Sequence, residues 1–278
     1  MNIDEGVSGR ATRSGTRIGS RATRVAGAMA LAVMVTMLGV AVSPAMATSP
    51  ATATAASDWE EDRPAGSGFL HGIDVSKWQG ELDYAAAAKQ GLRFVFARAT
   101  YGNSLADPLY KYNRREARAH GLQFGAYHFA RPDLDPGDAV NEADFFLDTA
   151  RPESRDLLPV LDLETTGKLS QTELRRWISA FVNRIHERIG VRPIIYTGGY
   201  MWRTRTGDWR GSARSGHALW IAHWGASKPS VPAANWDGNG YRFWQWTDCG
   251  RVGTSTRCVD YNVFRGTRLR TMKIWANR

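Results

Sequence analysis

The stretch Leu158-Pro159-Val160-Leu161-Asp162-Leu163-Glu164 is a short apolar run that ends in two carboxylates. Its apolar residues favour a buried strand, and the Thr165-Thr166-Gly167 that follows indicates a loop. Because side chains on a strand alternate between its two faces, Asp162 and Glu164 are expected to point the same way. Two acids this close favour one protonated and one ionised group. The stretch therefore predicts an acid pair at the end of an interior strand, and the alternative is a loop with two surface acids.

The amino-terminal part of the chain has the features of a secretory signal. Five Arg precede an apolar run of 18 residues from Val25 to Val42, and Ala45-Met46-Ala47 has the form of a cleavage site. Residues 1–47 are therefore predicted to be a signal peptide, although a run of this length also allows an uncleaved membrane anchor. Residues 48–68 are predicted to be a disordered leader or linker, and residues 69–278 are predicted to form one domain with a large core.

The chain is basic, with 36 Lys and Arg against 27 Asp and Glu and a net charge of +9. Residues 1–47 hold five Arg and two acids, so their removal lowers the net charge to +6. A moderately basic exported protein suits an anionic polymer such as a bacterial wall, where charge steers the encounter. Nucleic acid is a weak alternative, because the sequence has no recognition motif and no dense Lys/Arg stripe.

The sequence contains two cysteines, Cys249 and Cys258. In an exported chain they are predicted to form a disulfide that closes a hairpin loop, which the chain-entropy model values at about 2.5–3 kcal/mol. A metal-binding pair is less favoured, because there is no CxxC motif and no His nearby. None of the six His forms an HExxH pattern, so we expect no metal and no organic cofactor.

Strand-like and helix-like segments alternate along the predicted domain. Strands are predicted at 69–76, 93–100, 123–129, 158–164, 192–197, 218–224, 241–246 and 259–264. Helices are predicted near 84–90 and 138–149, and from the capping box at 170–173 to Gly190. A further helix is predicted to begin with Asp107 as its cap and Pro108 at its first position and to end at Gly121. This alternation indicates an α/β fold with a parallel sheet. About eight strands favour an irregular TIM-like (β/α) barrel with reduced helical content in its last third. An open doubly wound sheet is the alternative, but no Gly-rich dinucleotide loop follows the first strand.

Two further acids lie on the first and last predicted strands. Asp74 ends the first strand, and Asp260 sits in the last one. In a closed barrel these strands are neighbours, so both acids are expected to meet Asp162 and Glu164 at one mouth. Each acid has an alternative role, as a turn cap at Asp74 and as a backbone-bonding acid at Asp260. Paired carboxylates suit the cleavage of glycosidic bonds, whereas the sequence has no GxSxG nucleophile motif.

Aromatic residues are frequent beside the same strand ends. Eleven Trp exceed what a core of this size requires, and flat aromatic faces suit sugar rings, although any single Trp can be a core residue. The candidates are Tyr101, Tyr127, Tyr196, Trp220, Trp224, Trp244 and Trp246. His128 is near the end of the third predicted strand, where it is expected to contact substrate or a carboxylate, and the alternative is a structural His.

The motifs of the chain resemble those of glycoside hydrolase family 25, the CH-type lysozymes or N-acetylmuramidases. They follow the family's order, span nearly all of residues 70–265 and are together highly specific. The matching stretches are Gly72-Ile73-Asp74-Val75-Ser76-Lys77-Trp78-Gln79-Gly80, Gly125-Ala126-Tyr127-His128-Phe129-Ala130-Arg131-Pro132, Pro159-Val160-Leu161-Asp162-Leu163-Glu164, Pro193-Ile194-Ile195-Tyr196-Thr197, and Trp244-Gln245-Trp246 with Val259-Asp260-Tyr261-Asn262.

The resemblance implies an irregular β/α barrel that cleaves the β-1,4 bond between N-acetylmuramic acid and N-acetylglucosamine in peptidoglycan. By motif, Glu164 is the general acid. Asp162 then attacks the anomeric carbon or supports the substrate's own N-acetyl group as nucleophile. Asp74 and Asp260 match the family's other active-site acids. Tyr127 and Tyr196 match substrate-side tyrosines of the family. Together with the candidates chosen by their place at the strand ends, the residues expected to bind substrate are Tyr127, Tyr196, Tyr101, His128, Trp220, Trp244 and Trp246.

One segment departs from the family pattern. Many members read Lys-Ala-Thr-Glu-Gly where this chain has Arg98-Ala99-Thr100-Tyr101-Gly102, which affects substrate contacts more than the reaction. We expect a secreted or wall-associated monomer that acts on peptidoglycan glycan strands, without stable membrane association after signal cleavage and without nucleic acid. The alternatives are a different glycosidase on the same scaffold, such as a chitin-cleaving one, and a wall-binding module without turnover.

Overall fold

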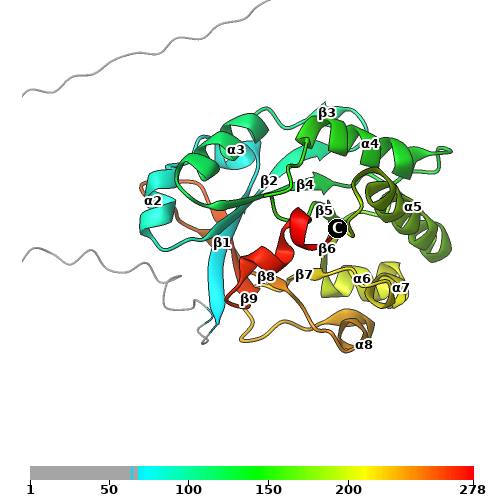
Figure 1. Ribbon diagram of the computed structural model, residues 1–278. Coiled ribbons are helices and arrows are strands. Elements are labelled where there is room, and N and C mark those ends of the chain that lie inside the picture. Colours follow the sequence, from blue (N-terminus) through cyan, green and yellow to red (C-terminus); the bar gives the residue numbers. More distant parts are fainter. Residues whose placement is uncertain (1–63, 65–67) are drawn as a thin grey trace, which may run out of the picture. The chain divides into compact units, whose positions relative to one another are not determined.

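The computed structural model describes Pro64 and residues 68–278 (Figure 1). The predicted signal peptide and nearly all of the predicted linker lie outside the described residues. Within the described part, no helix is long and apolar enough to cross a membrane. The two cysteines form the predicted disulfide, Cys249–Cys258, with a Cα–Cα distance of 4.2 Å.

Nine strands of the described region form one sheet, and eight of them close into a barrel. Their order is β1-β9-β8-β7-β6-β5-β4-β2, and pairing between β1 and β2 closes the ring, which confirms the predicted barrel. The short β3 (Leu105–Ala106) pairs only with the end of β2. The barrel strands are β1 (Phe69–Val75), β2 (Phe94–Tyr101), β4 (Gln123–Phe129), β5 (Val160–Asp162), β6 (Ile194–Gly198), β7 (Leu219–Ala222), β8 (Phe243–Gly250) and β9 (Val259–Arg265).

Strand β9 runs antiparallel to both of its neighbours, β8 and β1, whereas the other barrel pairs are parallel. The amino end of β9 therefore lies at the same rim as the carboxyl ends of the parallel strands. In this register Asp74 of β1 is the Cα partner of Asp260 of β9. The first and last barrel strands are thus neighbours, as the sequence predicted.

The helices lie outside the barrel and become short towards the carboxyl end, as expected (Figure 1). The longest is α5, which begins at the predicted capping box of Ser170 and Glu173 and ends at Gly190, whose φ is 74°. The short segment α8, which precedes β8, has left-handed dihedrals at residues 233–236. The helices are α2 (Tyr84–Lys89), α3 (Tyr110–Ala119), α4 (Asp138–Ala150), α5 (Gln171–Ile189), α6 (Gly199–Arg205), α7 (Gly211–Arg214) and α8 (Pro232–Asp237), with 3-10 turns η1 (Lys77–Gln79), η2 (Leu269–Met272) and η3 (Ile274–Ala276).

Helix α3 begins at Tyr110, two residues after Pro108, the predicted first helical position. The predicted cap, Asp107, is used elsewhere: its Oδ2 accepts hydrogen bonds from the Arg98 Nε at 2.9 Å and from the Lys77 backbone N–H at 3.0 Å. Its Oδ1 accepts from the Leu109 N–H at 3.0 Å, which makes a turn before the helix. A tertiary ion pair has therefore displaced a local cap.

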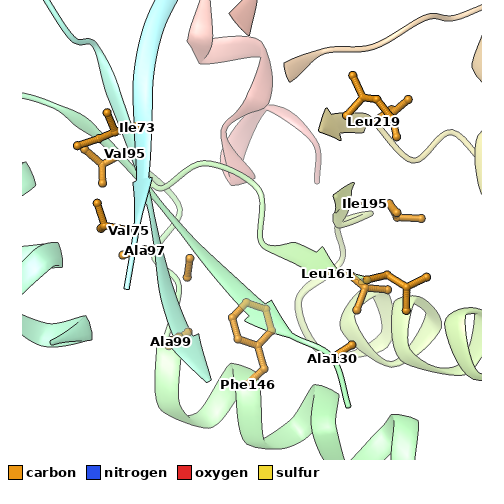
Figure 2. Close-up of a cluster of buried hydrophobic side chains, with 14 of the residues drawn as sticks. Ile73, Val75, Val95, Ala97, Ala99, Ala130, Phe146, Leu161, Ile195 and Leu219 are labelled. Carbon is orange, nitrogen blue, oxygen red and sulfur yellow. The ribbon is translucent and has the colours of Figure 1, made fainter. Parts of the chain in front are cut away.

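The core has two layers, because residues on each strand alternate between the two faces of the barrel wall. The outer layer lies between strands and helices. Figure 2 shows part of it, with Val95, Leu161 and Ile195 from strands and Phe146 from α4. The inner layer fills the barrel with large side chains, and the carboxyl-terminal 3-10 turns add three more. The inner residues include Phe94, Phe96, Val160, Ile194, Trp220, Phe243 and Phe264, with Leu269, Met272 and Ile274 from the turns.

Two inward-facing glycines make room for this filling. A Cβ built on Gly72 would lie 2.5 Å from the Phe94 ring, and one on Gly125 would lie 2.4 Å from the Phe96 ring. Both distances are well inside van der Waals contact. The barrel interior therefore depends on alternating small and large residues on neighbouring strands.

Candidate active site

A cavity of about 200 Å³ opens where the parallel strands end. Its wall combines four carboxylates, one guanidinium, amide and hydroxyl groups, and aromatic rings. The lining residues are Asp74, Ser76, Trp78, Gln79, Arg98, Tyr127, Phe129, Asp162, Glu164, Tyr196, Trp220, Gln245 and Asp260. The four acids that the sequence singled out thus line one cavity, although they come from three separate parts of the chain.

These side chains point into the cavity because residues on each strand alternate between the two faces of the barrel wall, as they do in the layers below. On β2, Phe94 and Phe96 point inward and the next inward position is Arg98. On β5, Val160 lies in the inner layer and the next inward position is Asp162. The uppermost inward layer is therefore polar, whereas the layers beneath it are apolar.

Asp74 and Asp260 form what we call the acid dyad. They lie directly opposite each other on antiparallel strands, a position in which two negative charges destabilise the sheet. Burial is the largest cause of a rise in the pKa of Asp260 to about 9, and the Asp74 charge adds to it. Burial also raises the pKa of Asp74, to about 6, against hydrogen bonds from Asn262, Gln245 and Asp260 that lower it. Near neutrality the dyad therefore holds one proton, and the proton resides on Asp260.

Asp162 and Glu164 form the acid pair. Asp162 is buried at the end of β5, and burial followed by the Glu164 charge raises its pKa well above the ordinary value. Glu164 is an exposed residue at the rim. Desolvation of its carboxyl group is the largest cause of its raised pKa, and we expect solvent to keep this rise smaller than that at Asp162. The hydrogen bond between the two raises the pKa of Asp162 and lowers that of Glu164. Without substrate the pair therefore carries its proton mainly on Asp162, where the sequence placed it on Glu164.

Two amide side chains and three ring donors surround the dyad. Asp74 Oδ2 accepts hydrogen bonds from Gln245 Nε2 at 2.9 Å and from Asn262 Nδ2 at 2.7 Å. The carbonyl oxygen of Asn262 accepts from the Trp220 indole N–H at 2.7 Å. The carbonyl oxygen of Gln245 accepts from the Trp224 indole N–H at 2.9 Å and from the Tyr196 hydroxyl at 2.8 Å. The dyad is thus fixed by a continuous polar network.

Arg98 is a buried cation within this acidic cavity. Its Nε and Nη2 lie 2.9 Å and 2.8 Å from Asp107 Oδ2, so a carboxylate outside the cavity wall compensates its charge. The Arg98 charge lowers the pKa of Asp162, against the larger effect of burial. This residue occupies the position where the sequence departs from the family pattern, and it keeps a positive charge there.

The aromatic wall contains three of the residues expected to bind substrate. Tyr127, Tyr196 and Trp220 line the cavity. Trp78, from the turn η1, also lines it and is 68% exposed, with Lys77 Nζ 4.9 Å from its ring centroid. An exposed indole at the mouth of a polar cavity is a suitable surface for a sugar ring.

A second cavity of about 260 Å³ adjoins the first and shares Glu164 and Tyr196 with it. Its other lining residues are Gly198, Met201, Ala222, His223 and Trp224. Trp224 is 52% exposed. Glu164 therefore lies between two adjoining spaces, one walled by acids and the other mostly apolar.

Two tryptophans expected to bind substrate do not line either cavity. Trp244 and Trp246 are buried in the outer core layer, and the Trp244 indole donates to the His223 backbone carbonyl at 2.9 Å. The expected substrate contacts of both residues are therefore wrong for this structure. The reason is strand alternation: Gln245 points into the barrel, so its two neighbours point out.

His128 also lies outside the cavity. It is fully buried on the outer side of β4, where Nδ1 lies 2.8 Å from Thr100 Oγ1 and Nε2 lies 2.6 Å from Glu142 Oε2. Its expected substrate contact is therefore wrong, whereas the expected contact with a carboxylate is made, to Glu142, in a structural role. Tyr101 is one layer removed from the cavity, because its ring stacks on Phe129, which lines the cavity, with a centroid distance of 5.0 Å.

Sequence reasoning missed Gln245, Asn262 and Trp78 as site residues and treated Arg98 only as a departure. Three of these lie in the motifs that carried the family resemblance, so a signal was present. The period of two around Gln245 identifies it as an inward residue only when the phase of β8 is known, and the sequence does not give that phase. Among the described residues, no group of three or more His, Cys, Asp or Glu has a geometry that could hold a metal ion.

Comparison with known proteins identifies relatives of this chain. The family model for glycosyl hydrolases family 25 matches residues 73–254. Lysozyme M1 of Streptomyces globisporus is 37% identical over 225 residues, which are 77% of this chain and 74% of that protein. An N,O-diacetylmuramidase of Arthroderma benhamiae is 34% identical over 230 residues, or 80% of this chain and 92% of that protein.

Solved structures agree with these relatives. The bacterial lysozyme from Streptomyces coelicolor superposes with a TM-score of 0.68 at 34% identity, covering 76% of this chain and 99% of that one. The barrel, the acid-lined cavity at its strand ends and these similarities lead to one assignment. The chain belongs to glycosyl hydrolases family 25 and is a glycoside hydrolase.

Proposed function

We propose that this protein is a secreted lysozyme that hydrolyses the β-1,4 bond between N-acetylmuramic acid and N-acetylglucosamine in bacterial peptidoglycan. Membership of family 25 and the names of its relatives, lysozyme and N,O-diacetylmuramidase, support a peptidoglycan substrate. The observation that carries the proposal is the acid pair, Asp162 and Glu164, in a cavity with two further acids. Paired carboxylates on either side of a glycosidic bond are the common machinery for its hydrolysis.

Glu164 is the proposed general acid. It lies at the boundary between the acid-lined cavity and the second cavity, so a bond between two sugars, one in each space, would pass beside its carboxyl group. A raised pKa keeps such a carboxyl protonated at the pH where it must donate to the leaving oxygen. The second cavity would then hold the leaving sugar.

Asp162 is the proposed second carboxylate, and its Oδ1 has a property that suits one of its two possible roles. Within the described part of the chain, this buried oxygen has no hydrogen-bond partner. A buried acceptor without a partner is costly, and the N–H of a substrate acetamido group would satisfy it. That contact supports participation by the substrate's own N-acetyl group. Direct attack by Asp162 on the anomeric carbon is the other role.

Substrate binding would also move the proton of the acid pair. In the free protein the proton lies mainly on the more buried Asp162. A hydrogen bond from the acetamido N–H to Asp162 favours its ionised form and lowers its pKa. Because Asp162 and Glu164 share a hydrogen bond, the proton would then pass to Glu164. Glu164 would thus receive the proton that it must donate once the substrate is bound.

Export is part of the proposal. The predicted signal peptide supports it, and so does the Cys249–Cys258 disulfide, because disulfides persist in oxidising compartments. A basic chain would be attracted to an anionic wall.

The substitution Glu164→Gln tests the assignment. It keeps the size of the side chain and removes the transferable proton, so release of reducing sugar from purified peptidoglycan should fall by about 10³-fold or more. The matched control is Glu187→Gln, a carboxyl of α5 that lies outside both cavities and should keep full activity. Circular dichroism should show intact folding of both variants.

The products distinguish the bond that is cut. Mass spectrometry of digested peptidoglycan should find muramic acid at the new reducing ends. Glucosamine at those ends would identify a glucosaminidase, and preference for chitin oligomers would identify a chitin-cleaving enzyme. Undiminished turnover by Glu164→Gln would exclude its role as general acid, and wall binding without hydrolysis at any pH would favour the binding module.

A further inference from the structure

Asp74 is held more firmly than any other carboxylate of the cavity. One of its oxygens, Oδ2, accepts two amide hydrogen bonds, from Gln245 at 2.9 Å and from Asn262 at 2.7 Å. All three side chains are buried. The two amides come from neighbouring strands, and Gln245 and Asn262 are Cα partners in the β8–β9 ladder. We call Gln245 and Asn262 the amide pair.

The amide pair has only one satisfactory orientation. An indole N–H is a donor with no acceptor function. Trp220 donates to the Asn262 carbonyl oxygen, and Trp224 donates to the Gln245 carbonyl oxygen. A flipped amide would place its NH₂ against an indole N–H and its oxygen against the Asp74 carboxylate. Both contacts would be repulsive, so the ring donors hold both NH₂ groups towards Asp74.

The Tyr196 hydroxyl strengthens this arrangement at Gln245. Burial raises the pKa of this phenol well above its ordinary value, so it keeps its proton and donates it to the Gln245 oxygen at 2.8 Å. Gln245 Oε1 thus accepts two donors while its Nε2 faces a carboxylate. Every strong polar contact of this side chain therefore favours the same rotamer.

A carboxylate that accepts two amide donors on one oxygen is stabilised in its ionised form. Its partner across the ladder, Asp260, has no comparable pair of donors among the described residues. The network therefore assigns the negative charge of the acid dyad to Asp74 and the proton to Asp260. A fixed charge at Asp74 also acts on the neighbouring acid pair, where it favours retention of the proton on Asp162.

We propose that Gln245 and Asn262 are positioning residues that hold Asp74 ionised and in a fixed place, and that Trp224 and Trp220 set their orientation. The inference rests on the proposed function and adds to it four residues that do not react themselves but that the acids need in order to act. Trp224 also lines the second cavity. A sugar bound there would contact the same indole that orients Gln245, so the two cavities are linked through one side chain.

The first test is titration of Asp74 in the free protein, with ¹³C-labelled aspartate and the Asp74→Asn variant to assign its carboxyl signal. The midpoint should lie near 6 in the unmodified protein. Gln245→Met and Asn262→Leu each remove one donor at similar volume, and each should raise the midpoint by about one pH unit. Trp224→Phe removes the orienting N–H and keeps one aromatic ring, while both NH₂ donors to Asp74 remain, so it should give a smaller rise in the same direction.

The matched control is Asn113→Leu. Asn113 is a fully buried amide on α3 that accepts from the Tyr84 hydroxyl at 3.0 Å and lies outside the cavity. Its loss should lower the melting temperature and leave the Asp74 midpoint unchanged. Trp224→Phe, a change at a half-exposed residue, keeps the test available if either amide variant fails to fold.

The second test is the pH dependence of peptidoglycan hydrolysis. Gln245→Met should lower kcat about tenfold or more with little change in KM, and the acid limb of its profile should move to higher pH. In Gln245→Glu the introduced carboxyl must itself be protonated to donate to Asp74, so the optimum should move to lower pH. Opposite movements of the two profiles are not expected from a loss of packing alone.

Two results would overturn the inference. One is an Asp74 midpoint that does not move in Gln245→Met, Asn262→Leu and Trp224→Phe. The other is a fall in kcat that follows melting temperature, as in Asn113→Leu, with unchanged pH limbs. If the unmodified protein fails to cleave peptidoglycan, the proposed function fails, but the titration result still decides the placement of charge at Asp74.

Discussion

Asp260 keeps its proton near neutrality, because burial disfavours its ionised form. Its pKa is about 9 in the folded protein, against an ordinary value of 3.8 that we take for the unfolded chain. Between these two pH values the folded state binds more protons than the unfolded state at this residue. The free energy of unfolding therefore falls as pH rises through this range.

The substitution Asp260→Asn should remove this fall in the free energy of unfolding with rising pH, because Asn does not titrate. The variant should be more stable than the unmodified protein at pH 7–8, and the difference should disappear as pH falls below 3.8, where Asp260 becomes protonated in both states. Urea denaturation at several pH values measures it, and hydrolytic activity should fall at the same time. As a control, Asp135→Asn, at an exposed loop residue, should show no such trend. A stability difference that does not vary with pH would contradict the assigned protonation of Asp260.

The acid residues were predictable, whereas the groups that orient them were not. A period of two places Asp162 and Glu164 together, and barrel closure brings Asp74 towards Asp260. Gln245 carries no charge, and a lone amide gives no chemical signal in a sequence. Its aromatic neighbours were selected instead, and they lie on the opposite face of the strand. The missing information was the phase of β8, which only the packed barrel determines.

At the scale of elements, local signals predicted what local interactions control. The capping box and apolar face of α5 gave its two ends within one residue, because the cap bonds are made within the helix itself. The start of α3 was wrong because Asp107 is taken by Arg98, a contact that depends on the fold. The antiparallel direction of β9 follows from the hairpin that the disulfide closes, and an all-parallel reading of the strands does not anticipate it.

The inner face of β4 allows a test of barrel packing. Gly125→Ala should destabilise the protein by about 1–3 kcal/mol, because the new methyl group would meet the Phe96 ring and the barrel interior has no free space there. Guanidinium denaturation measures the loss. Gly198→Ala is the matched control, since its Cβ would meet no atom within 4 Å, and its stability should change little. Equal effects at both positions would contradict a packing cost at Gly125.

At the scale of the whole molecule, export makes a prediction about the mature chain. Expressed with its own amino terminus in a secreting bacterium, the protein should appear in the medium beginning at Thr48, with a net charge of +6 on the remaining residues. Intact mass spectrometry checks the cleavage site and, by the loss of two hydrogens, the Cys249–Cys258 bond. Retention of the full-length chain in the membrane fraction would instead support the anchor.

The pairing of β1 with β9 has a consequence for the cell that makes this enzyme. Asp74 is translated long before Asp260, and their register exists only after β9 has joined β1. Such distant pairing is slow to form, because a long loop must close before the contact is made. A polypeptide that does not yet include β9 therefore lacks a complete set of acids, and the active site forms only once β9 has been made and the ring has closed.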